Sequence, residues 1–537
     1  MKRVATYDPI LLEVFRNLFF AASEEMGVAL CLSSFSPNIK ERRDYSCAIF
    51  DTAGKMAAQA AHLPAHLGSM PMSVEYVIET MNLKPGDVVA LNDPFHGGNH
   101  LPDITMISPV FAAGKKKRLI YYVANRAHHS DVGGSAPGSM SITTEIFQDG
   151  VVIPPVRLVR EGEIDGDVLR LILANVRTPE EREGDIAAQI AANRVGERRV
   201  LEIARRHGLA RMLRYTRELQ AYAERMTRSA IRGIPDGVYQ FEDAMEDDGF
   251  GSGPVPIRVK LTVKGERLRV DFTGSAPQTR GSVNAVESIA RTAAYYAVRC
   301  LVPYDIPNNS GCMDPIEVIA PEGTVVNSKF PAAVAGGNVE TSQRMVDAIL
   351  GALAKACPGV IPAASCGSMS NLSIGGIDPR PGVRQGKPFA YYETTGGGMG
   401  GGPLGPGEDA IHTHLTNTMN TPVEALEHAY PYRVRRYGIR RGSGGRGKHG
   451  GGDGIMREIE VMVDATVSFM TERREMAPYP LNGGEPGKPG RNAIYRGKKR
   501  IPVPGKARLE AKAGDVISLE TPGGGGWGRP PAKRKRG

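Results

Sequence analysis

Several features that would place this 537-residue chain in a common class are missing from its sequence. No apolar run approaches the roughly 20 residues that a membrane-spanning helix needs, and residues 1–8 lack the apolar segment of a secretory signal peptide. The six cysteines are scattered and form no Cys-x-x-Cys pair, which in a chain of this length is typical of reduced thiols. We therefore expect a cytoplasmic protein that does not interact with membranes.

Familiar nucleotide-binding patterns are also missing. The run 442–449 approaches a phosphate-binding loop, but His449 stands where that loop needs the serine or threonine that binds magnesium. The glycine-rich run 396–402 lacks the preceding strand and following helix of a dinucleotide-binding loop. If ATP is used, we expect this chain not to bind it through a familiar loop.

The positive charge of the chain has no nucleic-acid-binding motif to accompany it. The net charge is +9, and part of the excess lies in the basic tail 533–536. No helix-turn-helix, RNP or zinc-finger pattern is present. A basic protein also suits anionic substrates or an acidic partner subunit, so we expect no nucleic-acid partner.

The length of the chain and its patterning predict several domains of mixed α and β structure. A chain of 537 residues is too long for one hydrophobic core. Segments with helical periodicity alternate with short strand-like segments, and the last hundred residues are β-rich. We expect an α+β multidomain fold with mixed sheets, a long helical segment and a β-rich C-terminal region. The predicted domains are an α+β metal-site domain (1–165), a helical hairpin or interface segment (166–235), a β-meander with a helix (236–335), and a glycine-rich α/β and C-terminal β region (336–537).

Histidine is concentrated in one part of the chain, since six of the eleven histidines lie within residues 62–129. His100 and Asp103 follow two glycines that allow a tight backbone turn, and Pro102 stiffens the segment between them. Imidazole and carboxylate together are the ligands of divalent metals such as Zn, Mn or Fe. The sequence therefore predicts a metal site, although a hydrogen-bonded His–Asp pair that braces a loop would give the same pattern.

The adjacent pair His128 and His129 supplies the second part of this site. Predicted strands at 88–92 and 119–123 each lead into one of the histidine-bearing loops, so the two loops can meet. Adjacent residues of an extended chain point to opposite sides. We therefore expect only one of His128 and His129 to face the metal, while the other orients substrate or acts as an acid or base.

Further polar residues near these loops are candidates for proton transfer, namely His66, His96 and Asp131. His66 and its neighbour His62 are separated by a proline that argues against one helix through both. Their roles stay open between substrate contact, support of the metal ligands and plain packing. His412 and His414 share one face of a predicted strand, and they either approach the cluster or are buried and paired.

Arg42, Arg43 and Asp44 form a dense polar run beside a predicted strand. An arginine in such a run can hold a substrate carboxylate or phosphate, with Asp44 as its polar partner. A solvent-exposed polar face would have the same composition, so both interpretations remain open.

A further signal lies in a set of segments that follow one another along the chain. They are 38–48, 62–70, 92–94 with 97–98, 100–103, 138–140, 335–344, 417–424 and 521–528. Taken together, these segments resemble the hydantoinase B/oxoprolinase family, and the resemblance extends from about residue 5 to about residue 530.

This resemblance implies the metal-containing B-type subunit of an ATP-dependent cyclic amidase, of the N-methylhydantoinase or 5-oxoprolinase kind. In such systems an A-type partner with an actin-like ATPase fold uses ATP and Mg²⁺ to make a phosphorylated species, so a hetero-oligomer is expected. The related carboxylases hold their metal with a His-x-x-Asp pair and a later histidine. Carried over to this chain, those ligands are His100, Asp103 and one of His128 and His129.

Two other functions stay open. The chain is compatible with a subunit of an ATP-dependent acetone- or acetophenone-type carboxylase, although it is shorter than those subunits. It is also compatible with a non-catalytic scaffold that holds the ATPase partner, in which the histidine cluster is structural. The resemblance favours hydrolysis of a hydantoin, 5-oxoproline or lactam ring.

Overall fold

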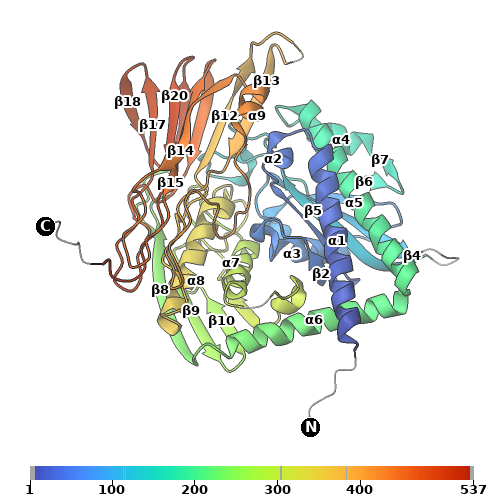
Figure 1. The fold of residues 1–537 in the computed structure, drawn as a ribbon. Coiled ribbons are helices and arrows are strands. Elements are labelled where there is room, and N and C mark those ends of the chain that lie inside the picture. Colours follow the sequence, from blue (N-terminus) through green and yellow to red (C-terminus); the bar gives the residue numbers. More distant parts are fainter. Residues whose placement is uncertain (1–6, 113, 115–116, 303–304, 383, 532–537) are drawn as a thin grey trace.

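The computed structural model describes residues 7–112, 114, 117–302, 305–382 and 384–531 (Figure 1). The start of the chain at 1–6 and the basic tail 533–536 lie outside these residues. Helices pack on four sheets, so the expected α+β multidomain fold with mixed sheets is confirmed. Across the described ranges, the structure contains no helix with both the length and the apolar character that crossing a bilayer requires.

A seven-stranded antiparallel sheet forms the N-terminal part of the molecule. Its strand order is β2-β1-β5-β4-β3-β6-β7. Helices α1 and α5 pack on one face, and α3 packs on the other (Figure 1). The bounds are α1 Pro9–Ser33, α2 Pro37–Lys40, β1 Tyr45–Phe50, β2 Met56–Gln59, α3 Ser69–Thr80, β3 Val88–Leu91, β4 Asp103–Ala112, β5 Arg118–His128, β6 Val156–Arg160, β7 Glu163–Ile164 and α5 Pro179–His207.

Helix α1 begins at Pro9, because Asp8 accepts a hydrogen bond from the amide of Ile10 and Pro9 occupies the first turn. Its inner side buries Phe15, Phe19 and Met26. Met26 packs closely on Gly196 of α5, since a Cβ atom at Gly196 would lie 2.4 Å from the Met26 sulfur and the methionine side chain would have to move. The small residue at this position lets α1 and α5 pack closely.

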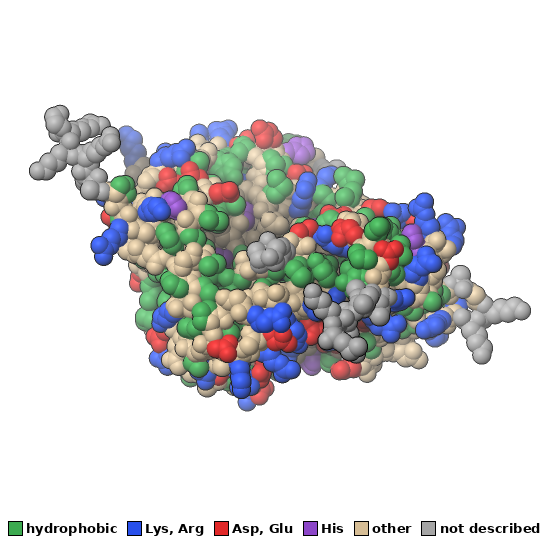
Figure 2. All heavy atoms as spheres, turned by 60° about the horizontal axis from the view of Figure 1, so that its bottom comes forward, with side chains coloured by type: hydrophobic (Ala, Val, Ile, Leu, Met, Phe, Trp, Pro, Cys, Tyr) green, Lys and Arg blue, Asp and Glu red, His purple; other side chains and the backbone are tan. Residues whose placement is uncertain are grey.

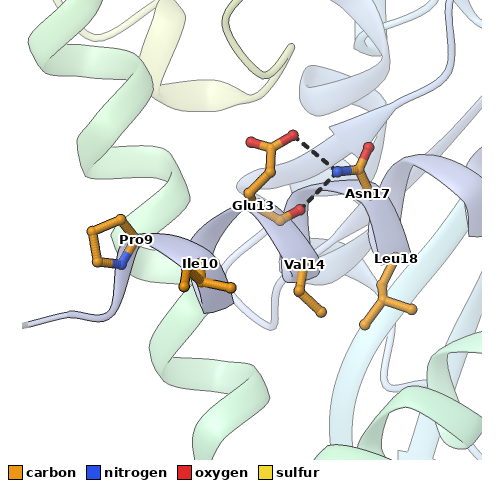
Figure 3. Close-up of a pocket in the computed structure, with 6 residues that line it drawn as sticks. All are labelled: Pro9, Ile10, Glu13, Val14, Asn17 and Leu18. Carbon is orange, nitrogen blue, oxygen red and sulfur yellow. Dashed lines mark hydrogen bonds between the residues drawn. The ribbon is translucent and has the colours of Figure 1, made fainter.

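The outer side of α1 is apolar at its beginning. Ile10, Val14 and Leu18 line a shallow surface hollow together with Pro9 (Figure 3). Asn17 turns back along the helix and donates hydrogen bonds to Glu13. The start of the helix thus presents apolar side chains on two sides, one buried and one open.

The long helical segment differs from the hairpin predicted for residues 166–235. It contains α4 (Gly166–Leu173), α5 and α6 (Leu209–Ile231). α5 and α6 meet at Gly208, which has a φ of +83°, and they run in different directions from that corner (Figure 1). α5 packs along α1 and the N-terminal sheet, so burial against the sheet, rather than pairing of the two helices, determines its position.

The middle of the chain forms a four-stranded sheet covered by two helices. Its strand order is β11-β10-β9-β8, with β10 and β11 parallel and the other pairs antiparallel. A short π-helix, Gly337–Thr341, precedes α8. The bounds are β8 Gly237–Met245, β9 Val255–Lys264, β10 Arg267–Asp271, α7 Glu287–Arg299, β11 Ile316–Ile319 and α8 Ser342–Ala356.

Two further sheets form the β-rich C-terminal region. Their strand orders are β13-β12-β16-β19 and β14-β15-β20-β17-β18. They enclose an apolar core of their own. The bounds are β12 Asn371–Asp378, β13 Lys387–Glu393, α9 Val423–Ala429, β14 Tyr432–Arg440, β15 Gly454–Val461, β16 Ala465–Met470, β17 Arg491–Arg496, β18 Lys499–Val503, β19 Lys506–Ala511 and β20 Val516–Glu520.

The glycine-rich runs of this region pack backbone against backbone. A Cβ atom at Gly398 would lie 1.9 Å from the carbonyl oxygen of Gly452, and one at Gly524 would lie 2.0 Å from that of Met399. Only glycine permits such a close approach of main chains. The runs 396–402, 442–452 and 523–528 therefore serve to pack loops together.

Replacing Phe19 by Ala tests the core between α1 and the N-terminal sheet. Phe19 is fully buried and its ring lies 5.9 Å from that of Tyr121, so its truncation should cost roughly 3–5 kcal/mol and lower Tm by roughly 5–10 °C. Phe20 is the matched control, because it is 41% exposed on the same helix. Thermal unfolding of both Ala variants should show a large loss for Phe19 only; equal losses would contradict the packing described.

Candidate metal centre

The two histidine-bearing loops meet because β4 and β5 are neighbouring antiparallel strands. Asp103 is the first residue of β4 and His128 is the last residue of β5. The register of the two strands pairs Asp103 directly with His128. Residues 25 positions apart in the chain are therefore placed face to face by the sheet.

The loop between β3 and β4 carries His100 back toward this pair. Asn92 fixes the loop, since its side-chain amide donates to the carbonyl of Leu101 at 2.8 Å and its oxygen accepts from the amide of Ile153 at 2.7 Å. Gly97 has a φ of +88°, and a Cβ atom there would lie 2.5 Å from the Ser73 amide nitrogen. The loop can fold only with glycine at this position.

His100, Asp103 and His128 form a compact buried cluster. The Oδ1 atom of Asp103 lies 3.3 Å from Nε2 of His100 and 3.3 Å from Nδ1 of His128. The two imidazole nitrogens are 3.2 Å apart. All three side chains are at most 3% exposed, and together they could hold one metal ion.

The donor atoms of this cluster fit a divalent metal. The Nδ1 atom of His100 faces the carbonyl oxygen of Ala335 at 3.2 Å, which places the proton on Nδ1 and leaves the lone pair of Nε2 directed into the cluster. Ligand atoms about 2.1 Å from one metal ion lie about 3.0–3.4 Å apart, which matches the three distances. Three protein ligands with one position open is also the pattern of catalytic zinc sites.

Asp103 is the charged centre of the cluster. Burial acts to raise the pKa of its carboxyl group, but the imidazoles of His100, His128 and His66 hold that pKa well below its usual value. Nε2 of His66 lies 3.4 Å from Oδ2 of Asp103, and its Nδ1 lies 2.8 Å from the hydroxyl of Ser46. His66 thus orients the carboxylate from behind rather than joining the three donors.

The far side of the cluster is closed by residues from the second half of the chain. The ring of Tyr392 stacks on His128, with centroids 4.4 Å apart and planes at 14°. Its hydroxyl donates to Oδ1 of Asn371 at 2.8 Å, and Nδ2 of Asn371 donates to Oε1 of Glu340 at 2.7 Å. Sequence reasoning missed these three residues, and the only signal near them was the family resemblance of segment 335–344, which contains Glu340.

Glu340 is a buried carboxyl group with one oxygen left over. Its Oε2 atom has no hydrogen-bond partner within the described residues. Burial, and then the nearby Glu472 carboxylate, raises the pKa of Glu340 to about 8. The carboxyl group is therefore mostly protonated at neutral pH, and it lies uncharged in the π-helix Gly337–Thr341.

The structure places two further candidates, His129 and Asp131, away from the three donors. His129 points to the opposite side of the strand, where its Nε2 lies 2.9 Å from Oε1 of Gln189 in α5, and burial lowers its pKa to about 4. Asp131 accepts from the amides of Gly133 and Gly138 and pairs with Arg177. These contacts give His129 and Asp131 roles in holding the loop.

His96 also lies outside the cluster, although it is close to His100 in sequence. Its side chain is 46% exposed and its Nδ1 lies 2.7 Å from Oδ2 of Asp93. Its ring stacks on Tyr76. The turn at Gly97 separates the directions of the two histidines.

The three residues that the sequence suggested for holding a substrate carboxylate or phosphate lie in different surroundings in the structure. Arg42 is fully buried, and its five donors face the Met419 and Tyr392 carbonyls and the side chains of Asn38, Thr394 and Thr418. Its guanidinium group therefore ties the turn between α2 and β1 to the C-terminal part of the chain, and protein acceptors occupy the donors that a substrate would need. Arg43 is exposed and has a φ of +56°, whereas Asp44 is buried 3.7 Å from Arg42 and its carbonyl accepts from the amide of His128.

Basic side chains do not gather on the face shown in Figure 2. Lysine and arginine are interspersed there with aspartate and glutamate. Nucleic-acid-binding surfaces instead carry a continuous basic patch or stripe. The view thus gives no support to a nucleic-acid partner on this face.

The fold and the site together define the class of this protein, an α+β protein with a buried His-Asp-His cluster. The family model of hydantoinase B/oxoprolinase matches residues 8–530. The chain belongs to this family.

The chain is similar in sequence to proteins from archaea, plants and bacteria. It is 39% identical to an uncharacterized protein of Methanocaldococcus jannaschii, over 97% of this chain and 91% of that protein. It is 38% identical to 5-oxoprolinase 1 of Arabidopsis thaliana, over 97% of this chain but only 42% of that protein. It is 32% identical to a Pseudomonas sp. protein that bears the name of the B-type subunit of a D-/L-hydantoinase, over 97% of this chain and 90% of that one. The chain thus spans less than half of the plant 5-oxoprolinase.

Two solved structures share the fold. The ATP-dependent caprolactamase of Pseudomonas jessenii matches with a TM-score of 0.90 and 29% identity, over 98% of this chain and 93% of that one. Acetone carboxylase matches with a TM-score of 0.86 and 19% identity, over 97% of this chain and 76% of that one. At 19% identity, the likeness to acetone carboxylase indicates a shared fold and nothing more.

Metal content measured on purified variants tests the cluster. His100→Ala and Asp103→Ala should lose most of the bound metal, because each removes one of three convergent donors. His96→Ala should keep it, since that imidazole is paired with Asp93 at the surface. Elemental analysis that found equal metal in all three variants would contradict the assignment of the donors.

The pH dependence of stability tests the protonated state of Glu340. Its pKa lies at about 8 in the folded chain, against an ordinary value of 4.5. The folded protein thus holds a proton that the unfolded chain releases, and this contribution to stability is lost as pH rises toward 8. Between pH 6 and 9 the Tm of the wild type should fall more steeply than that of Glu340→Gln, which carries no titrating proton. Parallel slopes would show that Glu340 is ionised when folded.

Proposed function

We propose that this chain is the metal-containing B-type subunit of an ATP-dependent cyclic amidohydrolase, which opens hydantoin, 5-oxoproline or lactam rings. The observation that carries the proposal is the buried cluster of His100, Asp103 and His128, in a chain of the hydantoinase B/oxoprolinase family. The likeness to the caprolactamase over nearly the whole of both chains supports the same reaction class.

Each residue in and around the cluster has a proposed role. His100, Asp103 and His128 would hold a zinc, manganese or iron ion, which when bound would polarise an amide oxygen or lower the pKa of a water molecule. Ala335 fixes the proton of His100, and His66 and Ser46 keep the Asp103 carboxylate oriented. His66, as the imidazole nearest to the carboxylate outside the three donors, is the proposed group for moving a proton.

ATP is assigned to an A-type ATPase partner in a hetero-oligomer. The glycine run 442–449 supports this division, because it packs against residues 523–528 and His449 stacks on Trp527. Phosphorylation by the partner would make the amide a better electrophile for attack at the cluster. The six cysteines are all unpaired, which suits the reducing cytoplasm where this reaction is proposed to occur.

The test is an assay of the complex with its A-type partner on cyclic amides. ATP-dependent ring opening is expected, and His100→Ala should lower kcat by at least about 100-fold, since even supporting residues of metal sites are worth about 10–100-fold. Phe20→Ala, which changes only an exposed side chain, should retain the activity. A complex of His100→Ala with full activity would identify the chain as a scaffold.

A parallel assay separates hydrolysis from carboxylation. The same complex is offered acetone or acetophenone with ATP, with and without bicarbonate, and product mass is scored. Hydrolysis predicts no product heavier by one carboxyl group. A bicarbonate-dependent gain of that mass, without ring opening of any cyclic amide, would assign the chain to the carboxylases.

A further inference from the structure

A buried carboxylate outside the cluster, that of Asp149, holds the main chain on which one metal donor depends. Asp149 is 2% exposed and follows the short 3-10 helix Ile146–Gln148. Its Oδ2 atom accepts hydrogen bonds from the amides of Val334 and Ala335, at 3.0 and 3.2 Å. The carbonyl oxygen of Ala335 is in turn the acceptor that faces Nδ1 of His100 at 3.2 Å. Asp149 is thus joined to His100 through a single residue.

The two peptide planes that flank Ala335 are held by different groups. Asp149 fixes the plane that carries the Ala335 amide. The plane that carries its carbonyl is held by the amide of Gly336, which donates to the carbonyl of Ser282 at 2.7 Å. Rotation about the N–Cα or the Cα–C bond of Ala335 would turn the carbonyl oxygen away from the imidazole, so its direction depends on both anchors. Of the two, only Asp149 is a side chain that a substitution can remove.

Both carboxylate oxygens of Asp149 are engaged. The hydroxyl of Thr143 donates to Oδ1, and the two amides donate to Oδ2. Burial raises the pKa of the carboxyl group to about 6, while these donors and the imidazole of His100 act to lower that pKa. The group is therefore mostly ionised at neutral pH and acts only as an acceptor. With its amide hydrogen committed to Asp149, Ala335 offers His100 only a carbonyl oxygen, so the imidazole must donate from Nδ1.

The loop that carries Asp149 also begins at a metal donor. β5 ends at His128, and the chain leads from there to Asp149. The amide of Val151 donates to the carbonyl of Val132 at 2.9 Å, which closes this loop at its base. A loop that starts at one donor, His128, therefore ends on the group that orients a second donor, His100.

We propose that Asp149 is a positioning residue of the metal centre, which holds residues 334–335 so that Ala335 keeps a proton on Nδ1 of His100 and the Nε2 lone pair directed at the metal. The proposal rests on the proposed function for the presence of the metal ion, and it concerns affinity for that ion rather than the reaction. Groups that orient a metal-bound imidazole are worth about 10–100-fold in metal affinity. An aspartate that only braces a loop would change the stability of the fold and leave His100 as it is.

Zinc binding to the metal-free full-length chain measures the proposed effect. Zn²⁺ is used alone, because such sites bind it more tightly than Mn²⁺ or Fe²⁺, and it is titrated by calorimetry. Asp149→Ala should bind Zn²⁺ at least about tenfold more weakly than the wild type, since the two amides lose their acceptor. Asp149→Asn should recover most of the affinity, because its side-chain oxygen can still accept both hydrogen bonds. Equal affinity in the wild type and Asp149→Ala, or an Asp149→Asn variant as weak as Asp149→Ala, would overturn the proposal.

Asp87 provides the matched control. It is also 2% exposed, and its two oxygens accept from the amides of Lys84 and Glu161, both at 2.9 Å. Its third partner is Arg157 on β6. Asp87→Ala should therefore lower Tm about as much as Asp149→Ala does, yet leave the affinity for Zn²⁺ unchanged. If both variants lose affinity equally, general destabilisation is responsible and the proposal fails.

The Nδ1 hydrogen of His100 gives a readout that a purely structural role would not change. NMR of the zinc-loaded chain, labelled with ¹⁵N in histidine, shows which imidazole nitrogen carries hydrogen and how fast that hydrogen exchanges with water. We expect a slowly exchanging Nδ1 hydrogen in the wild type and in Asp87→Ala, and faster exchange in Asp149→Ala at saturating Zn²⁺. Zinc bound through Nδ1 in the wild type would overturn the proposal even if Asp149→Ala does not fold.

The proposed function is judged separately, with the ATPase partner present. ATP-dependent ring opening by the wild type, together with equal Zn²⁺ affinity in every variant, would refute the role of Asp149 and leave the amidohydrolase standing. An inactive wild-type complex, in which Asp149→Ala still binds Zn²⁺ more weakly than Asp87→Ala, would refute the amidohydrolase and leave the role of Asp149 standing. A wild-type chain that binds no Zn²⁺ would overturn both.

Discussion

The pairing of β4 with β5 is the interaction on which the candidate site depends. Because the register sets Asp103 opposite His128, a carboxylate and an imidazole from two different loops are brought together by main-chain hydrogen bonds of the sheet. A shift of one residue would turn either side chain to the other face. The same alternation sends His129 toward α5, so one register determines both which histidine joins the cluster and which one anchors a helix.

A buried carboxylate also constrains what surrounds it. Asp103 is 1% exposed, and an unpaired charge at that depth would be very costly. The protein surrounds it with three imidazoles and the amide of Asn99. Burial lowers the pKa of His66 and of His128, whereas in His100 burial is outweighed by the Asp103 carboxylate, which raises its pKa. The cluster thus favours a positive charge next to Asp103, and a divalent cation at the three convergent donors would supply it. Electrostatics and the direction of the lone pairs thus favour the same occupant.

Local sequence patterns predicted the donors of this site, whereas the residues that close the site around them are brought there by long-range packing. The His100-x-x-Asp103 spacing and the strands that lead to His128 are local features, and the structure brings these residues together. Tyr392 reaches the cluster from more than 200 residues away, and Glu340 is linked to it only through Asn371. No periodicity in the sequence predicts such contacts. His96 shows that nearness in sequence can also mislead. It lies only four residues before His100, but the turn at Gly97 directs its side chain to the surface, away from the cluster.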